Sequence, residues 1–166
     1  YVETCPHYLF LDDSMYPKLE GRAKMNPPLR TKADQSILWR ALNEGVIDTI
    51  GSDHAPHKLG EKAQPLCKCP SGVPGIETTL PLMISAWKDG KVTLAKIVEL
   101  LHTNPQQIFK LKSNDDLVLV DIVNYRTLSD EQMASKCQWT PFVGMKLTGF
   151  PRYVFTQNTL IECAKL

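Results

Sequence analysis

Val46-Ile47-Asp48-Thr49-Ile50 runs directly into Gly51-Ser52-Asp53-His54-Ala55-Pro56-His57, and this junction is the most informative feature of the chain. The first part is rich in β-branched residues and predicts a buried strand that ends just before Asp53. In parallel α/β folds, functional groups lie at that end of the strands. The carboxylate and the two imidazoles are therefore candidates for metal or proton chemistry, although Pro56 is also compatible with a plain turn.

A second apolar run ends in a similar way. Tyr1-Val2-Glu3-Thr4-Cys5-Pro6-His7-Tyr8-Leu9 is strand-like, is broken by a proline and is closed by a histidine. Neutral imidazole and carboxylate are both good ligands for zinc. If the two strand ends lie side by side, His7 and Asp53 can therefore bind one metal ion.

These motifs, together with others farther along, resemble those of cyclic amidohydrolases, and of dihydroorotases most closely. The resemblance covers nearly the whole chain. Its motifs, in order, are Glu3-Thr4-Cys5-Pro6-His7-Tyr8-Leu9, Lys24-Met25-Asn26-Pro27-Pro28-Leu29-Arg30, the segment from Asp53 to His57, Gly72-Val73-Pro74-Gly75-Ile76-Glu77-Thr78 and Gln138-Trp139-Thr140-Pro141-Phe142.

The resemblance implies an α/β fold that is part of a larger whole. A complete TIM (β/α)8 barrel takes ~250 residues, and this chain has 166. We expect residues 1–112 to form the C-terminal part of such a barrel, about strands 6 to 8 with their helices. Residues 113–166 are expected to be a β-rich segment that contributes to a small composite β-sandwich. The family's His-x-His pair is not in this sequence, so the remaining metal ligands would lie outside the chain.

The resemblance also implies a reaction, the reversible hydrolysis of dihydroorotate to N-carbamoyl-aspartate in pyrimidine biosynthesis. His7 and Asp53 would ligate a binuclear zinc site, and Asp53 would also be the catalytic base. Substrate-binding roles would fall to Asn26, His57, Ser71 and Gly72. His54 would have no direct role and would instead orient Asp53. This chain alone would be inactive, because two ligands cannot hold two metal ions.

Other functions remain open at this stage. An allantoinase or a dihydropyrimidinase would share the surroundings of His7, and a non-catalytic dihydroorotase-like protein can serve as a scaffold for aspartate transcarbamoylase. Asn26 before two prolines and His57 after Asp53 favour dihydroorotase, and the retained His7, Asp53 and His57 disfavour a scaffold. A homodimer and association with aspartate transcarbamoylase are both compatible with the resemblance.

Composition is that of an ordinary globular interior. Hydrophobic residues make up 43% and charged residues 22%, and the net charge is +1. No nucleic-acid or membrane partner is therefore expected. The five cysteines are odd in number and unevenly spaced, which indicates reduced thiols and a cytoplasmic location. Cys67-Lys68-Cys69 is expected to be a pair of surface thiols, because a structural zinc site needs wider spacing and a second pair.

The remaining pattern predicts alternating helices and strands. Thr31 is a candidate N-cap with Asp34 at the third helical position, and Gly45 is placed to end that helix. Loops are expected over 11–24 and 58–76, a very short strand over 24–26, helices over 77–89, 93–101 and from 104, and strands over 117–123, 145–148 and 152–156.

Overall fold

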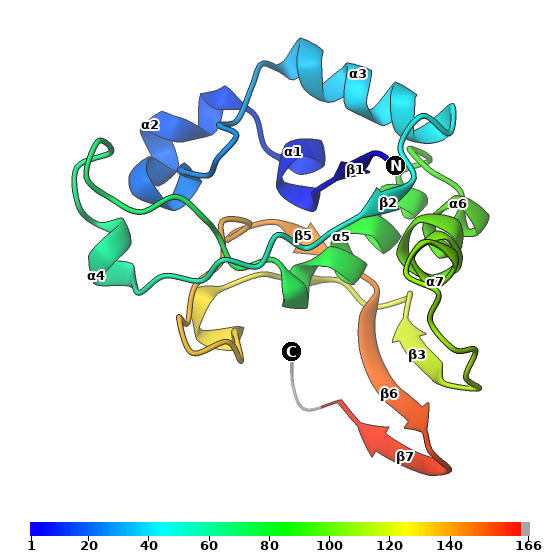
Figure 1. Cartoon of the computed structure of the whole chain (residues 1–166). Coiled ribbons are helices and arrows are strands. Elements are labelled where there is room, and N and C mark those ends of the chain that lie inside the picture. The colour runs from blue at the N-terminus through cyan, green and yellow to red at the C-terminus, as the bar shows by residue number, and fades with distance from the viewer. Residues whose placement is uncertain (164–166) are drawn as a thin grey trace.

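A short parallel pair of strands lies at the centre of the molecule. The computed structural model describes residues 1–163, in which β1 (Glu3–Thr4) pairs with β2 (Thr49–Ile50) in the register Glu3↔Thr49 and Thr4↔Ile50. Parallel neighbours need a crossover connection, and the chain between them supplies it, with α3 across the top of the view in Figure 1. Both strands are shorter than the sequence predicts.

The first strand is short because a helix replaces its second half. Helix α1 (Pro6–Phe10) begins directly after Cys5, with a proline in its first turn. Proline is favoured there because its fixed φ suits a helix and its missing N–H would have no partner. The expected break at Pro6 is present, but the run after it is helical rather than strand-like, so His7 lies on a helix rather than at a strand end.

Residues 11–26, which the sequence predicts to be a loop followed by a very short strand, have a different structure. Residues 11–24 contain η1 (Asp13–Met15), α2 (Tyr16–Leu19) and η2 (Glu20–Ala23). Residues 24–26 form no strand in the described part of the chain; instead the Lys24 carbonyl accepts a hydrogen bond from the distant Gly72 N–H at 3.0 Å. This tertiary contact, which the local sequence does not reveal, takes the place of the hydrogen bonds that a strand would form with a neighbouring strand.

Helix α3 (Lys32–Asn43) confirms the predicted capping box. The Thr31 side chain accepts from the Asp34 N–H, and the Asp34 side chain accepts from the Thr31 N–H. Gly45 follows the helix with φ +79°, a left-handed conformation that glycine adopts without strain. The 58–76 segment is not entirely irregular, because it contains α4 (Leu59–Lys62).

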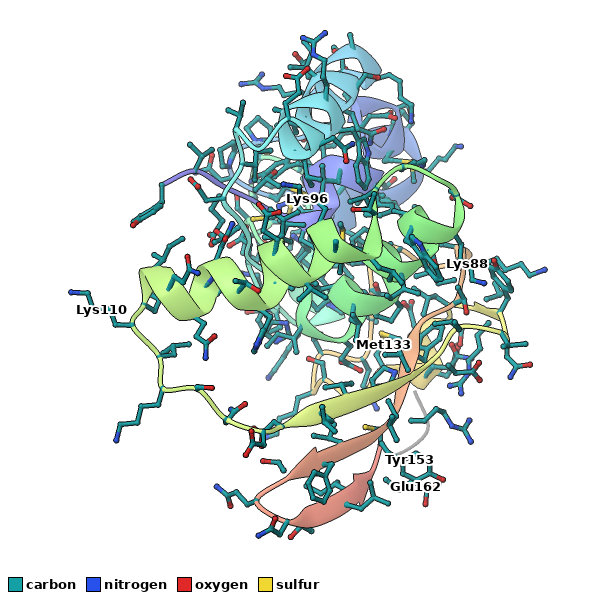
Figure 2. The ribbon with its side chains drawn as sticks, turned by 90° about the vertical axis from the view of Figure 1, so that its right-hand side faces the viewer. Lys88, Lys96, Lys110, Met133, Tyr153 and Glu162 are labelled. Carbon is teal, nitrogen blue, oxygen red and sulfur yellow. The ribbon has the colours of Figure 1, made fainter. Side chains whose placement is uncertain are left out.

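Helix α5 (Ile76–Lys88) matches the predicted helix closely, and a longer helical stretch follows it. Helix α6 (Leu94–Val98) continues without a break through the π-helical turn η3 (Glu99–Thr103) into α7 (Asn104–Ile108). Figure 2 shows this stretch between the labels Lys96 and Lys110. Helix α7 thus begins at Asn104 with Pro105 in its first turn, as predicted, but it continues the preceding helical turn without a gap. Proline cannot supply the N–H of a regular helical turn, and the wider turn accommodates it.

The last part of the chain is rich in strands, as predicted. Strands β3 (Leu117–Asp121), β6 (Phe150–Thr156) and β7 (Thr159–Glu162) form an antiparallel sheet in the order β3-β6-β7. Strand β4 (Arg126–Thr127) pairs with β5 (Lys146–Leu147), and η4 (Asp130–Gln132) lies between them. The hairpin partner β7 was not anticipated.

The buried residues form two clusters. One joins α3, β2, α5 and α6 through Leu42, Ile50, Met83 and Ile97. The other contains Leu11, Ala23 and Met25 from the first half and Trp139, Phe142 and Phe150 from the last part. Residues on both sides of position 113 thus share one core, and the division at that position stays a prediction. No helix within residues 1–163 is long and apolar enough to cross a membrane.

Two glycines with nearly equal φ angles distinguish the cost of backbone strain from the cost of overpacking when a side chain is added. Gly149 has φ +87° and Gly144 has φ +85°, but a Cβ at Gly149 would overlap the Ile84 side chain whereas one at Gly144 would meet open space. We expect Gly144→Ala to cost about 1–2 kcal/mol from the left-handed conformation alone. Gly149→Ala should cost a further ~1–3 kcal/mol from overpacking. Urea denaturation of both variants checks this, and equal losses would contradict the packing of this turn on Ile84.

Candidate metal centre

Three side chains with metal-binding atoms meet where β1 and β2 end. Cys5, His7 and Asp53 each offer a ligand atom, and these atoms lie within 4.8 Å of one another. Cys5 ends the first strand segment, His7 lies in the first turn of α1, and Asp53 follows β2. Because the two strands are parallel, their carboxyl ends lie at the same edge. The predicted proximity of His7 and Asp53 is thus observed, and Cys5 joins them.

His7 is buried and incompletely satisfied. Its side chain is 1% exposed, and its Nε2 atom has no hydrogen-bond partner among the described residues. The nearest charged atom is Asp53 Oδ2 at 3.7 Å, which is too long for a hydrogen bond. Burial lowers the pKa of His7 to about 4, and the Asp53 carboxylate only partly opposes this shift. The imidazole is therefore neutral near pH 7 and has a lone pair available for a cation.

Asp53 is held in a strained conformation at the rim of the site. Its φ is +43°, in the left-handed region that costs a non-glycine residue free energy, and its side chain is 45% exposed. In this conformation the carboxylate faces His7 and stays accessible from solvent. Strain of this kind clusters at functional sites, where the surrounding structure maintains it.

Cys5 is the member of this cluster that sequence reasoning missed. Burial raises the pKa of its thiol to about 12, with further contributions from the charges of Asp53 and Glu3. The thiol is therefore protonated in the absence of a cation, and a bound cation would favour the thiolate. Its placement two positions before His7, across a proline that starts a helix, is the signal that could have identified it.

The donor set fits zinc. Imidazole nitrogen, carboxylate oxygen and thiolate sulfur are all common zinc ligands. The unpartnered His7 Nε2 is the stronger indication, because a buried polar atom without a partner costs about 1–3 kcal/mol. A cation at this position would supply the missing partner.

The other predicted site residues gather around a separate cavity. This cavity has a volume of about 620 Å³, and neither His7 nor Asp53 is among its lining residues, which are Tyr16, Lys24, Met25, Asn26, Pro28, Leu66, Cys67 and Ser71. Cys67 is exposed there, whereas Cys69 is buried, so the expectation of two surface thiols holds for Cys67 only. The described cysteines are all free, as expected.

His57 and Gly72 adjoin the cavity behind Ser71. The His57 Nε2 atom lies 3.0 Å from the Ser71 carbonyl oxygen. Gly72 has φ +123°, and a Cβ there would lie 2.6 Å from that of Ala55, so only glycine fits. Its N–H donates to the Lys24 carbonyl and is not free for a ligand. Gly72 therefore shapes the cavity wall rather than offering its amide.

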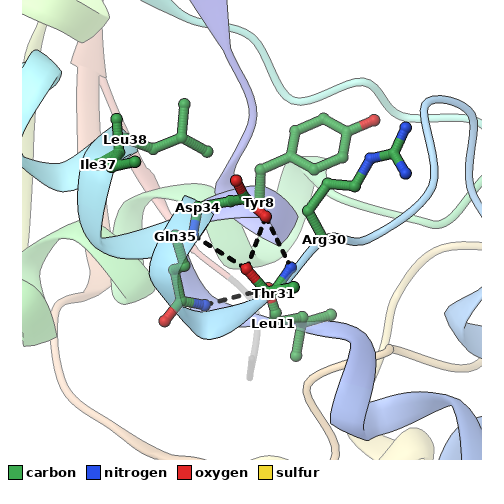
Figure 3. A pocket seen from close by; sticks show the side chains of 8 residues that line it. All are labelled: Tyr8, Leu11, Arg30, Thr31, Asp34, Gln35, Ile37 and Leu38. Atoms are coloured by element: carbon green, nitrogen blue, oxygen red, sulfur yellow. Dashed lines mark hydrogen bonds between the residues drawn. The ribbon is translucent and has the colours of Figure 1, made fainter.

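Tyr8 connects the metal-ligand cluster with the cavity segment. Its hydroxyl donates to the Pro27 carbonyl at 2.8 Å, next to Asn26, and its ring packs edge-on against His7. The ring also lines a smaller cavity of about 260 Å³ between α1 and the start of α3, where it lies beside Arg30 (Figure 3). No predicted site residue lines that smaller cavity.

His54 makes hydrogen bonds other than the one expected. Its Nδ1 atom accepts from the N–H groups of Gly75 at 3.2 Å and Ile76 at 3.4 Å, at the start of α5. No hydrogen bond between His54 and Asp53 is present among the described residues, so the expectation that His54 orients Asp53 has no support from these contacts. The first N–H groups of a helix have no partner within the helix, and here they donate to the imidazole nitrogen of His54.

Comparison with known proteins identifies relatives that are much longer than this chain. No family model matches. The chain is 38% identical to the dihydroorotase of Methanosarcina mazei over 169 residues, which cover 96% of this chain and 37% of that protein. Its fold matches an L-hydantoinase (dihydropyrimidinase) from Arthrobacter aurescens with a TM-score of 0.92 at 28% identity, over 99% of this chain and 39% of that one.

A third relative is not an active enzyme. The inactive dihydroorotase-like domain of a Chaetomium thermophilum CAD-like multifunctional protein matches with a TM-score of 0.72 at 26% identity, over 95% of this chain and 42% of that chain. The chain thus spans about two fifths of the length of these relatives. From its sequence identity, its mixed α/β fold and its motifs, the chain is a partial-length member of the dihydroorotase family of cyclic amidohydrolases.

Proposed function

We propose that the chain is the C-terminal portion of a zinc-dependent dihydroorotase, which hydrolyses dihydroorotate reversibly to N-carbamoyl-aspartate in pyrimidine biosynthesis. The observation that carries this proposal is the buried, unpartnered His7 Nε2 atom beside Asp53 and Cys5. A parallel strand pair with helical connections is consistent with barrel units 6 to 8. A cytoplasmic location fits the free thiols. A homodimer and association with aspartate transcarbamoylase stay predictions.

His7 would hold one zinc ion and Asp53 the other, with Cys5 within reach and with further ligands from outside this chain. A zinc pair would polarise the amide carbonyl and make a strong nucleophile available at neutral pH. Within the described residues, the cluster offers only these three groups. We therefore expect the isolated chain to be inactive.

Asp53 is suited to act as the general base. Its carboxylate is partly open to solvent, and only its Oδ2 atom faces His7, so its other oxygen can accept a proton. In the hydrolytic direction, the water oxygen bonds to the ring carbonyl carbon and the carbon–nitrogen bond breaks. Asp53 would take the proton from the water and deliver it to the departing nitrogen.

The 620 Å³ cavity and the residues behind it would receive the substrate. Dihydroorotate carries a carboxylate and ring amides, which need donors and acceptors. The Asn26 side chain, at the cavity edge, provides both. His57 would contact the carboxylate, and Ser71 and Gly72 would shape the wall near the ring.

The choice among related functions rests on two comparisons. The curated relatives are dihydroorotases at 36–38% identity, whereas the hydantoinase structures share 26–32%. This difference favours dihydroorotate over a hydantoin or dihydropyrimidine ring. A non-catalytic scaffold is the alternative from another class, since an inactive dihydroorotase-like domain shares the fold. The unpartnered His7 Nε2 favours catalysis, because a scaffold has no need for it.

Substrate preference is the first test. The full-length protein should hydrolyse dihydroorotate and leave allantoin and dihydrouracil almost untouched, and a zinc chelator should abolish turnover until zinc is restored. Preference for another ring would move the chain to a different cyclic amidohydrolase. If the zinc-bound protein hydrolyses none of these rings, the non-catalytic scaffold is the function that remains.

Zinc content tests the metal ligands independently of activity. His7→Ala in the full-length protein should lower bound zinc from about two ions per chain to about one or fewer, because it removes a ligand. Elemental analysis after dialysis measures this, with His102→Ala, an exposed histidine, as the matched control. Unchanged zinc in a folded His7→Ala variant would rule out the assignment.

Steady-state kinetics distinguish the role of Asp53 as general base from the role of His57 in substrate binding. Asp53→Asn should lower kcat by ~10²–10⁴-fold, because it removes the base. His57→Ala should raise KM roughly 10- to 100-fold with little change in kcat, because a hydrogen bond to a charged group contributes about 1.5–3 kcal/mol. Asp89→Asn, an exposed aspartate at the end of α5, is the control. A large loss of kcat in His57→Ala at unchanged KM would show that His57 acts in turnover rather than in substrate binding.

A further inference from the structure

Lys62 is a fully buried lysine without a partner carboxylate. It lies at the end of α4, is 1% exposed, and forms no ion pair in the described residues. Lysine is almost never buried in this way unless its charge is paired. Burial lowers the pKa of Lys62 to about 8, so at pH 7 most molecules keep the ammonium group with its three donors.

All three donors are used on backbone carbonyls. The Nζ atom donates to the carbonyl oxygens of Lys24 at 2.9 Å, Pro70 at 2.8 Å and Gly72 at 2.9 Å. Lys24 and Ser71 line the 620 Å³ cavity, and Pro70 and Gly72 flank Ser71 on either side. One ammonium group therefore joins residues 24–26 and 70–72, two segments that each contribute to the cavity lining.

A second set of contacts extends this arrangement to His57. Lys62 Nζ lies 5.8 Å from the centroid of the Trp139 ring. The Trp139 Nε1 atom donates to the His57 carbonyl oxygen at 2.7 Å, and the His57 ring contacts the Ser71 carbonyl oxygen. Gly72, Ser71 and His57 are thus within one or two contacts of Lys62, and Asn26 lies two positions after Lys24, whose carbonyl Lys62 binds.

We propose that Lys62 is the positioning residue of the substrate site, in that its three hydrogen bonds set the separation of the segments carrying Asn26 and Ser71. This proposal rests on the proposed function for its kinetic readout. Lys62 lines no part of the cavity, so it acts through the two segments and does not touch substrate. Without its donors the Pro70 carbonyl loses its bond, and the two segments stay joined by the Gly72 N–H bond to the Lys24 carbonyl and by the Lys24 Nζ bonds to the carbonyls of Leu66 and Cys69, which do not reach residues 70–72.

The test compares Lys62→Met with Arg22→Met in the full-length, zinc-loaded protein. Methionine keeps the length of lysine and removes every donor. Arg22 is a matched control, because it packs on the same Trp139 ring at 5.3 Å but donates to Asp130 and the Thr140 carbonyl, away from the cavity. Lys62→Met should raise KM for dihydroorotate tenfold or more with kcat within threefold. Arg22→Met should lower the melting temperature and leave KM within twofold.

Equal changes of KM in the two variants, or an unchanged KM in a folded Lys62→Met protein, would overturn the proposal. If Lys62→Met does not fold, Lys62→Gln replaces it, because its amide keeps two donors and should give an intermediate KM. An unchanged KM in Lys62→Gln would then count against the positioning role.

A readout without catalysis separates this proposal from the proposed function. If the wild-type protein has no turnover, the enzymatic proposal fails and amide hydrogen exchange decides the role of Lys62. The amides of Ser71, Gly72 and Val73 should exchange at least tenfold faster in Lys62→Met than in wild type, and at the wild-type rate in Arg22→Met. Equal protection in all three proteins would overturn the positioning role.

Discussion

The parallel pairing of β1 with β2 is the constraint on which the candidate site depends. It brings Thr4 beside Ile50, so that Cys5 and His7 on one segment lie next to Asp53 on the other. Two paired residues per strand would be a weak element by themselves. The buried cluster of Leu42, Ile50, Met83 and Ile97 beside them supplies the apolar burial that holds the pair in place. The strained backbone of Asp53 and the buried His7 nitrogen without a partner are both unfavourable. Bound metal ions would offset these costs, because they would bind both side chains.

Local features were predictable from the sequence, and long-range ones were not. The Thr31–Asp34 capping box and the helix that ends before Gly90 depend on residues a few positions apart. Lys62 and Trp139 depend on contacts with segments far away in the chain. A lysine in a polar segment is ordinarily a surface residue, and the sequence around Lys62 does not indicate that its ammonium group meets the Lys24 carbonyl, 38 positions away, and those of Pro70 and Gly72, 8 and 10 positions away. The helix at Pro6–Phe10 was missed because β-branched and aromatic residues outweighed a helix-starting proline.

The candidate site divides into two parts that sequence reasoning treated as one. His7 and Asp53 lie together at the strand ends, whereas Asn26 and Ser71 line the 620 Å³ cavity and His57 and Gly72 adjoin Ser71. Tyr8 joins the two through its bond to the Pro27 carbonyl. The division is compatible with a chain that spans only about two fifths of its relatives' length. In a complete barrel, residues from other strands would line the space between a metal centre and a substrate pocket.

The central claim is that His7 and Asp53 are ligands of one binuclear zinc site. The most direct measurement is an anomalous difference map from crystals of the full-length protein, collected at the zinc edge. The account predicts a zinc peak within bonding distance of His7 Nε2 and another within bonding distance of an Asp53 carboxylate oxygen, at ~2.0–2.2 Å. A fully zinc-loaded crystal with no peak near either side chain would contradict it.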